Sequence, residues 1–382
     1  MTVLPRKAKE RHKRPKYYID IIDGKQAKDT RKGAEKMDWD RVPAPVRRLC
    51  RRLWAAGKEA LPVGGCVRDL LLGRAPGDWD VTTSALPEEV MALFRRAIPT
   101  GLKHGTLTVL SGPMAVEVTT FRREGGYADG RHPDAVAFDA TLEQDLGRRD
   151  FTINAMALDR DGGVVDLFGG REDLAAGVVR CVGEPERRFA EDALRMLRAV
   201  RFAAQLGFAI EPGTARAMEA CAGRVAAVSR ERIRTEMEKT LLSPRPQAIG
   251  MMVRAGLLDH LYDWDKGLDF SSLAASPGTK EGRWRAFCGL TGFPIPALPV
   301  ERKLRRAVEH PEAAALEGLA LTGRELKSLG LRGEAIGQTR RRLAEHILAH
   351  PEDNDRRTLL RLWRSWQREQ VKEEETDQAR GG

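Results

Sequence analysis

The chain has 382 residues, of which 42% are hydrophobic and 31% are charged, and its formal net charge is +10. This length accommodates two or more domains with buried cores. The sequence has no run of about 18 apolar residues, and its five cysteines include no C-x-x-C pair. These features exclude a membrane-spanning helix, a disulfide framework and a zinc cluster, and they predict a cytoplasmic protein. The positive charge fits a nucleic-acid partner, but it also fits a well-solvated surface.

Residues 1–40 are polar and rich in lysine and arginine. We predict a mostly disordered basic arm, which either contacts RNA phosphates or is a solvated tail. The pattern of residues 43–56 then predicts an amphipathic helix.

A glycine pair, an arginine and two alternating carboxylates, which are candidate nucleotide and metal ligands, occur together in residues 61–83, LPVGGCVRDLLLGRAPGDWDVTT. Gly64 and Gly65 lack side chains, so backbone N–H groups there can approach a phosphate closely. A short helix is predicted over residues 67–72, ending at Gly73. The alternative interpretation of the glycine pair is a simple bend.

Residues 78–81, Asp-Trp-Asp-Val, are predicted to form a strand. Alternate side chains of a strand share a face, so Asp78 and Asp80 should project to the same side. Two such carboxylates repel each other unless a cation lies between them, and oxygen ligands of this kind suit Mg²⁺. A D-x-D pair on its own also fits a solvated turn.

Taken together, GG-x-VRD-x-LLG-R and the following D-x-D resemble the signature of the template-independent nucleotidyltransferases. These are the tRNA CCA-adding enzymes of the bacterial and eukaryotic class, the A-adding enzymes and the bacterial poly(A) polymerases. The resemblance implies that Asp78 and Asp80 hold Mg²⁺ and that Gly64, Gly65 and Arg68 bind the nucleotide.

Further along, a helix is predicted over residues 87–97, and two strands over 107–110 and 115–121 joined by a turn at 111–113. Glu117 interrupts the apolar residues of the second strand, and it either faces solvent or supplies a third metal ligand. In the family a third carboxylate commonly comes from a neighbouring strand, which favours a catalytic role for Glu117. Residues 100–106 also resemble the CCA-adding pattern.

Residues 122–137, RREGGYADGRHPDAVA, are predicted to form a mobile loop. The resemblance implies that this loop is needed for the final A addition.

Residues 148–157, RRDFTINAMA, reproduce a second motif of the family. This match implies nucleotide binding by Arg149, Asp150 and Asn154, with the arginine holding triphosphate oxygens through bidentate contacts. On its own, the motif also fits a helix start capped by Asp150 with a surface arginine pair.

A helix with an apolar stripe is predicted over residues 189–207. Asp192, Arg195, Arg198 and Arg201 follow one another at steps of three, which predicts one neighbouring row of polar groups on this helix. The row is either a surface ladder of ion pairs or a binding surface. It resembles the family motif E-D-x-x-R, which serves there as an amino-acid template for the incoming base.

Donor and acceptor chemistry explains why this pair of residue types suits a template. Cytosine and adenine each present an amino donor beside a ring-nitrogen acceptor, and Asp192 can accept from the first while Arg195 donates to the second. Uracil and guanine present the reverse pattern and would leave buried polar groups unpaired. The resemblance implies that Arg198 and Arg201 support the pair or bind phosphates.

Residues 229–239 predict a further helix and match the family pattern ERI-x-x-E-x-x-K. Residues 264–291 are predicted to be rich in loops, and residues 298–366 have repeated helical periodicity with basic faces.

We therefore predict an α+β catalytic head, like the sheet and helices of the polymerase-β nucleotidyltransferases, followed by an all-α neck, body and tail. The expected divisions are a basic arm at 1–40, a head at 41–170, a neck at 171–240 and an RNA-binding body and tail at 241–382. The implied activity is addition of CMP, CMP and AMP to the tRNA 3′ end from CTP and ATP. The alternatives are an A-adding enzyme or poly(A) polymerase, and a catalytically inactive RNA-binding protein, which the presence of Asp78 and Asp80 disfavours.

Overall fold

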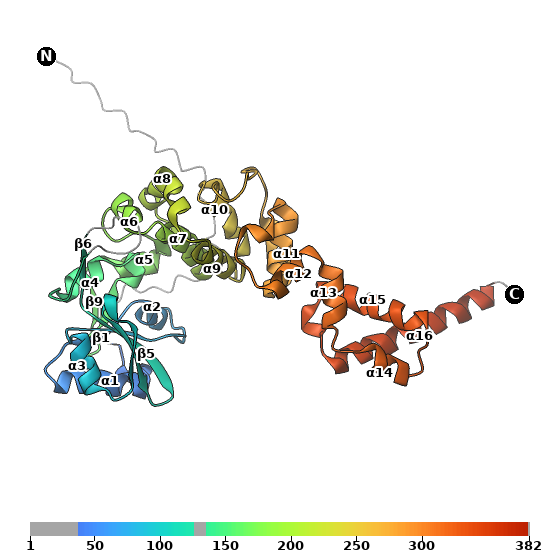
Figure 1. The fold of residues 1–382 in the computed structure, drawn as a ribbon, viewed down its shortest axis with the longest axis horizontal. Coiled ribbons are helices and arrows are strands. Elements are labelled where there is room, and N and C mark those ends of the chain that lie inside the picture. The colour runs from blue at the N-terminus through green and yellow to red at the C-terminus, as the bar shows by residue number, and fades with distance from the viewer. Residues whose placement is uncertain (1–36, 126–134, 381–382) are drawn as a thin grey trace, which may run out of the picture. The chain divides into compact units, whose positions relative to one another are not determined.

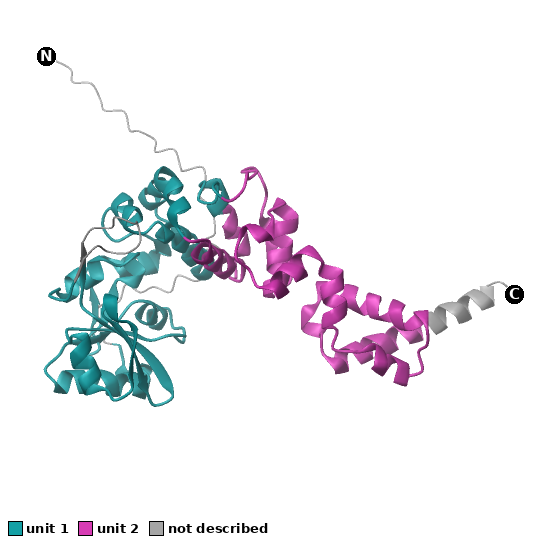
Figure 2. Cartoon of the chain, in the orientation of Figure 1, with its two compact units in different colours: residues 1–228, 251–260 teal, residues 229–250, 261–382 magenta. Residues whose placement is uncertain are grey.

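A computed structural model describes residues 37–125 and 135–380 of the chain. The chain divides into two compact units, one formed by residues 1–228 and 251–260 and the other by residues 229–250 and 261–382 (Figure 2). The predicted basic arm, apart from residues 37–40, lies outside the described residues. Residues 126–134 of the predicted loop also lie outside them. The division into arm, head, neck and tail stays a prediction.

The first unit is built on a mixed five-stranded sheet with the strand order β1-β2-β5-β4-β3 (Figure 1). β2 and β5 run parallel, and the other neighbours are antiparallel. The predicted hairpin is confirmed as β4 and β5. The strand bounds are β1 (Ala60–Pro62), β2 (Asp80–Thr83), β3 (Ala97–Gly101), β4 (Thr106–Ser111) and β5 (Met114–Thr120).

The strand predicted from residue 78 begins two residues later than expected, at Asp80. The backbone N–H of Glu117 donates to the carbonyl of Trp79, and the first paired residues of the two strands are Asp80 and Glu117. Asp78 therefore precedes the ladder and lies in a bend. Because Asp78 lies outside β2, the prediction that Asp78 and Asp80 share one face of a strand is wrong.

Four helices accompany the sheet: α1 (Ala44–Ala55), α2 (Gly65–Leu71), α3 (Pro87–Leu93) and α4 (Leu142–Gly147). α1 packs against β1, β4 and α3 (Figure 1). The predicted helices at residues 43–56 and 67–72 are confirmed. The helix predicted over residues 87–97 is shorter than expected, because the chain enters β3 at Ala97.

The residues just before α1 are hydrogen-bonded to the turn after β8 (Met156–Leu158) and to α2. The backbone N–H of Met37 donates to the carbonyl of Gly162 at 2.7 Å, and the Trp39 indole donates to the carbonyl of Asp159 at 2.9 Å. Arg41 donates to the carbonyl of Leu70 in α2 at 2.9 Å. We call residues 37–41 the N-terminal strap.

The rest of the first unit is mainly helical. Phe189–Gly207 does not form the single predicted helix, because the chain is extended at Asp192, with φ −148° and ψ 105°. A two-stranded parallel pair, β10 and β11, also departs from the expected all-α neck. The remaining elements are β6 (Arg123–Gly125), β7 (Ala135–Ala137), β8 (Met156–Leu158), β9 (Val164–Asp166), α5 (Gly170–Ala176), β10 (Val178–Val179), α6 (Pro185–Glu191), α7 (Leu194–Leu206), β11 (Ala209–Ile210) and α8 (Pro212–Cys221).

The second unit is helical in its described residues. The predicted helices at residues 229–239 and within 298–366 are confirmed. The loop-rich region predicted at 264–291 is partly wrong, because α11 occupies its last twelve residues and begins after a Thr279 cap. The helices that follow α8 in the chain are α9 (Arg230–Leu241), α10 (Ile249–Arg254), α11 (Lys280–Thr291), α12 (Arg302–Glu309), α13 (Pro311–Gly318), α14 (Gly323–Ser328), α15 (Glu334–Ala349) and α16 (Arg356–Arg380).

In the part of the chain that the structure describes, no helix combines the length and the apolarity needed to cross a bilayer.

Candidate functional site

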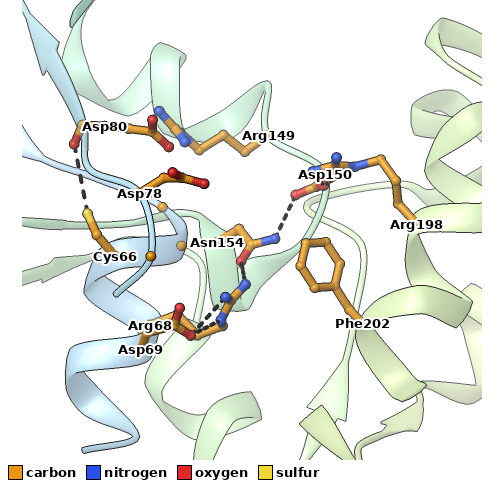
Figure 3. A pocket seen from close by; sticks show the side chains of 13 residues that line it. Cys66, Arg68, Asp69, Asp78, Asp80, Arg149, Asp150, Asn154, Arg198 and Phe202 are labelled. Atoms are coloured by element: carbon orange, nitrogen blue, oxygen red, sulfur yellow. Dashed lines mark hydrogen bonds and ion pairs between the residues drawn. The ribbon is translucent and has the colours of Figure 1, made fainter. Parts of the chain in front are cut away.

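The first unit contains a pocket of about 290 Å³ where α2, the start of β2, the segment after α4 and α7 meet (Figure 3). Its lining combines acidic, basic and glycine residues with one aromatic ring. The lining residues are Gly64, Gly65, Cys66, Arg68, Asp69, Gly77, Asp78, Asp80, Arg149, Asp150, Asn154, Arg198 and Phe202.

The glycine pair forms the entry to α2. Gly64 has a φ of +81°, a conformation that side-chain-bearing residues rarely adopt. A Cβ atom at Gly64 would lie 3.0 Å from Nη1 of Arg149. The missing side chain therefore lets an arginine from a distant part of the sequence reach the backbone at the start of α2.

The acidic side of the pocket is formed by Asp78 and Asp80, whose carboxylates both lie toward the Arg149 side chain in Figure 3. Burial raises the pKa of Asp80 to about 6, the nearby Glu117 and Asp78 carboxylates add to this rise, and Arg149 opposes it. Glu117 is exposed on β5, directly opposite Asp80 in the strand register. The protein thus gathers more negative charge here than its own cations balance.

Arg149 stands between this acidic side and the rest of the pocket. Its one hydrogen bond to a described side chain runs from Nη2 to the Asp145 carboxylate at 3.4 Å, and its Nε is buried without a partner among the described residues. An arginine so loosely held by the protein retains donors for a bound anion.

Asp145 is the carboxylate that accepts this hydrogen bond from Arg149. Its carboxylate is fully buried and accepts hydrogen bonds from the Thr82 hydroxyl at 3.0 Å and from Arg148 at 2.8 Å. Burial by itself would raise the pKa of Asp145, but Arg148 and Arg149 outweigh it and lower the pKa. Through Thr82, the residue links the arginine pair to β2, the strand that begins with Asp80.

The opposite side of the pocket is a continuous network of charged and polar groups (Figure 3). Arg68 Nη1 donates to Asn154 Oδ1 at 2.8 Å, and Asn154 Nδ2 donates to Asp150 Oδ1 at 3.1 Å. Arg198 donates to Asp150 Oδ2 from both Nε, at 2.8 Å, and Nη2, at 2.6 Å. Arg68 is also paired with Asp69, and the hydrogen bonds join α2, residues 150–154 and α7 in one network.

Asp150 is the central group of that network. Burial raises the pKa of this carboxyl, but the Arg198 guanidinium and the amide of Asn154 more than reverse the effect and bring the pKa to about 2. Asp150 also accepts from the backbone N–H of Phe151 at 2.8 Å. The alternative interpretation of Asp150 as a helix cap is wrong, because the short 3₁₀ helix Thr152–Asn154 begins after Phe151 and has no side-chain cap, while the second carboxylate oxygen of Asp150 accepts from Arg198.

The predicted base-reading pair is placed differently from the sequence expectation. Asp192 lies in the break between α6 and α7, and its carboxylate accepts from the backbone N–H of Leu194 at 3.0 Å. Arg195 lies on α7 and donates to Glu191 Oε2 at 2.6 Å and to the carbonyl of Arg148 at 3.1 Å. The predicted row of Asp192, Arg195, Arg198 and Arg201 on one helix is therefore wrong, because Asp192 precedes α7.

The structure brings most predicted site residues to the pocket, but not all of them. Glu117, Asp192, Arg195 and Arg201 do not line the pocket formed by the described residues. Arg201 packs over the Phe202 ring at 4.0 Å and donates to Gln205 at 3.0 Å. The roles of all these residues stay predictions.

The acidic side fits a magnesium ion by its donor chemistry. Two carboxylates that repel each other, and that lie across from an arginine, offer the hard oxygen ligands that Mg²⁺ prefers. No group of three His, Cys, Asp or Glu residues in the described ranges, 37–125 and 135–380, could hold one metal ion. The pocket is thus suited to an ion that takes its remaining ligands from substrate phosphates and water.

Sequence reasoning missed two residues that organise the site, Asp145 and Phe202. Asp145 stands three and four residues before Arg148 and Arg149, a helical spacing that does carry a weak local signal. Phe202 was assigned only to an apolar stripe, and no local pattern distinguishes it from a core residue.

Two family models match the chain. Residues 60–180 match the poly(A) polymerase head domain, and residues 207–264 match the probable RNA- and SrmB-binding site of polymerase A. The first match contains all the residues that line the pocket except Arg198 and Phe202, which lie on α7.

Among known proteins, the chain is similar to several bacterial CCA-adding enzymes. It is 46% identical over 250 residues to the enzyme of Geobacillus stearothermophilus, a stretch that is 64% of this chain and 62% of that enzyme. It is 53% identical over 194 residues to the enzyme of Lactiplantibacillus plantarum, covering 51% of this chain and 48% of the relative. The chain thus spans less than two thirds of the length of these relatives.

Solved structures extend the similarity along the chain. A crystal structure of the Bacillus stearothermophilus CCA-adding enzyme in complex with CTP matches with a TM-score of 0.64 and 32% identity, covering 86% of this chain and all of that one. The Thermotoga maritima CCA-adding enzyme complexed with tRNA matches with a TM-score of 0.52 over 86% of this chain and 97% of that one, and at 22% identity it supports the fold alone.

Proposed function

This chain belongs to the family of class II tRNA CCA-adding enzymes and bacterial poly(A) polymerases, and we propose that it adds CMP, CMP and AMP to the tRNA 3′ end from CTP and ATP. One observation carries the proposal. The pocket sets an acidic pair, Asp78 and Asp80, against the loosely held Arg149, in a chain of which 86% is similar to a CTP-bound CCA-adding enzyme. A cation and a triphosphate would balance both sides of this pocket at once.

Asp78 and Asp80 would hold Mg²⁺, with Glu117 adding negative charge from the neighbouring strand. Mg²⁺ bound there would supply positive charge that acidifies the RNA 3′-hydroxyl and offsets charge on the departing pyrophosphate. The high pKa of Asp80 in the free protein supports this role, because a cation would favour the ionised carboxylate.

The triphosphate would lie between the glycine turn and the arginines. Gly64 and Gly65 leave room beside the backbone, and Arg68 is held in place by Asn154 and Asp69. The buried Nε of Arg149 has no hydrogen-bond partner among the described residues. Asp150 and Asn154 would face the sugar from the same network. Binding of this kind orients the α-phosphate for attack by the RNA hydroxyl.

We propose that Asp192 and Arg195 read the base, supported by Arg198 and Arg201. In the described structure Arg195 is paired with Glu191, which would hold its guanidinium in place for donation to the ring nitrogen. Arg195→Ala should then impair use of CTP and ATP and weaken discrimination against UTP and GTP. If selectivity among the four triphosphates is unchanged, Arg195 serves only the helix junction.

The RNA partner would be bound by the helical second unit. Its basic residues on α15 and α16 support a role for this unit in holding tRNA, and the family match at residues 207–264, which spans parts of both units, adds α8 and α9 to the candidate RNA-binding region. Five cysteines without a disulfide support a cytoplasmic location.

The decisive experiment measures incorporation of labelled CTP and ATP into tRNA transcripts that end before CCA, after C and after CC. We expect two C additions followed by one A, resolved at single-nucleotide length. A addition to the CC transcript alone would indicate an A-adding enzyme, and long A tracts would indicate a poly(A) polymerase. The absence of any incorporation, with tRNA still bound, would indicate an inactive RNA-binding protein.

A further inference from the structure

The aromatic ring of Phe202 lies at the point where three arginines meet. Its ring centroid is 5.2 Å from the guanidinium carbon of Arg68, 5.4 Å from that of Arg198 and 4.0 Å from that of Arg201. The side chain is 6% exposed and lines the pocket (Figure 3). Its orientation is fixed by Phe151, whose ring meets it edge-on at 5.7 Å.

Guanidinium groups gathered in this way repel one another. Two of them have a carboxylate partner in the network, Arg68 with Asp69 and Arg198 with Asp150. Hydrogen bonds through Asn154 and Asp150 also link Arg68 to Arg198, but they hold the N–H edges of the two guanidinium groups and leave their faces to be packed by another group. The face of an aromatic ring carries partial negative charge and attracts cations within about 6 Å. A single ring that contacts both guanidinium groups therefore adds a second constraint on their mutual arrangement, beside the hydrogen bonds.

We propose that Phe202 is a positioning residue for nucleotide binding, which holds the Arg68 and Arg198 guanidinium groups in place for the triphosphate and sugar. This inference rests on the proposed function of the same pocket. The contacts of the ring are with the guanidinium groups, so it acts through the two arginines. An aliphatic side chain of similar volume would fill the space but would not attract the cations.

The test compares Phe202→Leu with Phe202→Tyr, which keeps the ring, and with Phe121→Leu. Phe121 is a matched control, because it is also buried in the first unit but packs in the apolar cluster with Leu61 and Leu146. Steady-state addition of CMP to tRNA lacking CCA should show a KM for CTP raised about tenfold in Phe202→Leu, with kcat changed less than about twofold. Phe202→Tyr should keep the wild-type KM, and Phe121→Leu should change thermal stability without changing KM.

A double-mutant cycle then tests whether the ring acts through Arg68. The KM effect of Phe202→Leu should be much smaller in an Arg68→Ala background than in the wild-type chain, since the group it positions is gone. Additive effects, or an equal rise of KM in Phe121→Leu, would overturn the inference. The wild-type chain separates the two proposals: if it incorporates no CTP, the proposed function fails, whereas an active wild type with an unaffected Phe202→Leu variant refutes only the role of Phe202.

Discussion

Two aspartates of the same pocket have opposite electrostatic surroundings. Asp80 has its pKa raised to about 6, by burial first and then by the carboxylates of Glu117 and Asp78. Asp150 is more deeply buried, but the paired Arg198 lowers its pKa to about 2. The difference lies in whether the protein itself supplies the neutralising cation.

This contrast assigns different tasks to the two sides. The Asp150 side is complete without a ligand, because each of its charged groups is hydrogen-bonded to another part of the first unit. The Asp80 side is incomplete, and a bound cation would relieve the repulsion there. A preformed side can orient a substrate, whereas an unbalanced side provides the driving force for binding a metal ion.

The largest loss of activity should come from replacing an aspartate on the Asp80 side of the pocket. Asp80→Ala should reduce nucleotide transfer by about 10³-fold or more, because the charge developing in the transition state loses its counterion. Binding of tRNA, measured by gel shift, should persist, since the basic surfaces are untouched. Near-normal transfer at saturating Mg²⁺ would refute the metal assignment.

Arg149 lies between the two sides, and its removal should have the next largest effect. Arg149→Ala should raise the KM for CTP and ATP by roughly 10- to 100-fold, because a charge-assisted contact to the triphosphate is lost. Arg149→Lys keeps the charge but not the paired donors, so it should recover only part of the loss. Full recovery with lysine would show that charge alone matters at this position.

Stability should change in opposite directions when each aspartate is neutralised. At pH 7 in the absence of metal, Asp150→Asn should lower the free energy of unfolding by on the order of 2 kcal/mol, because Arg198 loses a buried partner. Asp80→Asn should raise the free energy of unfolding, since it removes a repulsive charge. Chemical denaturation of both variants measures the two effects, and a loss of equal size in both would contradict the comparison.

The pH dependence of the free energy of unfolding follows from the pKa shifts of Asp80 and Asp150. The folded-state pKa of Asp150 lies below its ordinary value of 3.8, so its contribution is present above pH 4 and is lost as the pH falls toward 2. The folded-state pKa of Asp80 lies above 3.8, so its ionisation destabilises the fold as the pH rises from 4 to 6. The gain from Asp80→Asn should therefore be visible at pH 7 and vanish at pH 4, as followed by unfolding in each buffer.

The smallest effect should be stabilisation by the metal. Mg²⁺ at about ten times its dissociation constant should stabilise the wild-type chain by about 1.4 kcal/mol, seen as a modest rise in the melting temperature. Asp78→Asn and Asp80→Asn should each remove most of that rise. An undiminished rise in both variants would place the ion elsewhere.

Local signals in the sequence were enough for much of the fold and for most of the pocket. The glycine pair, the apolar residues of α2 and the turn between β4 and β5 act over a few residues, so their structures were predicted correctly. The break at Asp192 was not predicted, because the apolar stripe continues through it. There the Asp192 carboxylate accepts a hydrogen bond from the backbone N–H of Leu194 in a local turn, and this hydrogen bond competes with continuation of the helix.

The organisation behind the site could not be predicted in this way. Asp145 depends on Thr82, which lies 63 residues earlier in the chain, and Phe202 depends on Arg68 from another helix. Such pairs are created by folding and leave no pattern at short range. A family motif identifies which residues matter, but the structure is needed to show which residues hold them in place.

The N-terminal strap has a practical consequence for handling the protein. The backbone of Met37 passes so close to Gly162, which has a φ of +83°, that a Cβ atom there would lie 2.3 Å from the Met37 carbonyl oxygen. The contacts of the first unit therefore include Met37 and Trp39, which precede α1 and the family match that begins at residue 60. A truncated protein that starts at Ala44 would lose the Trp39 indole contact and should melt earlier and be digested faster by protease than one that starts at Met37.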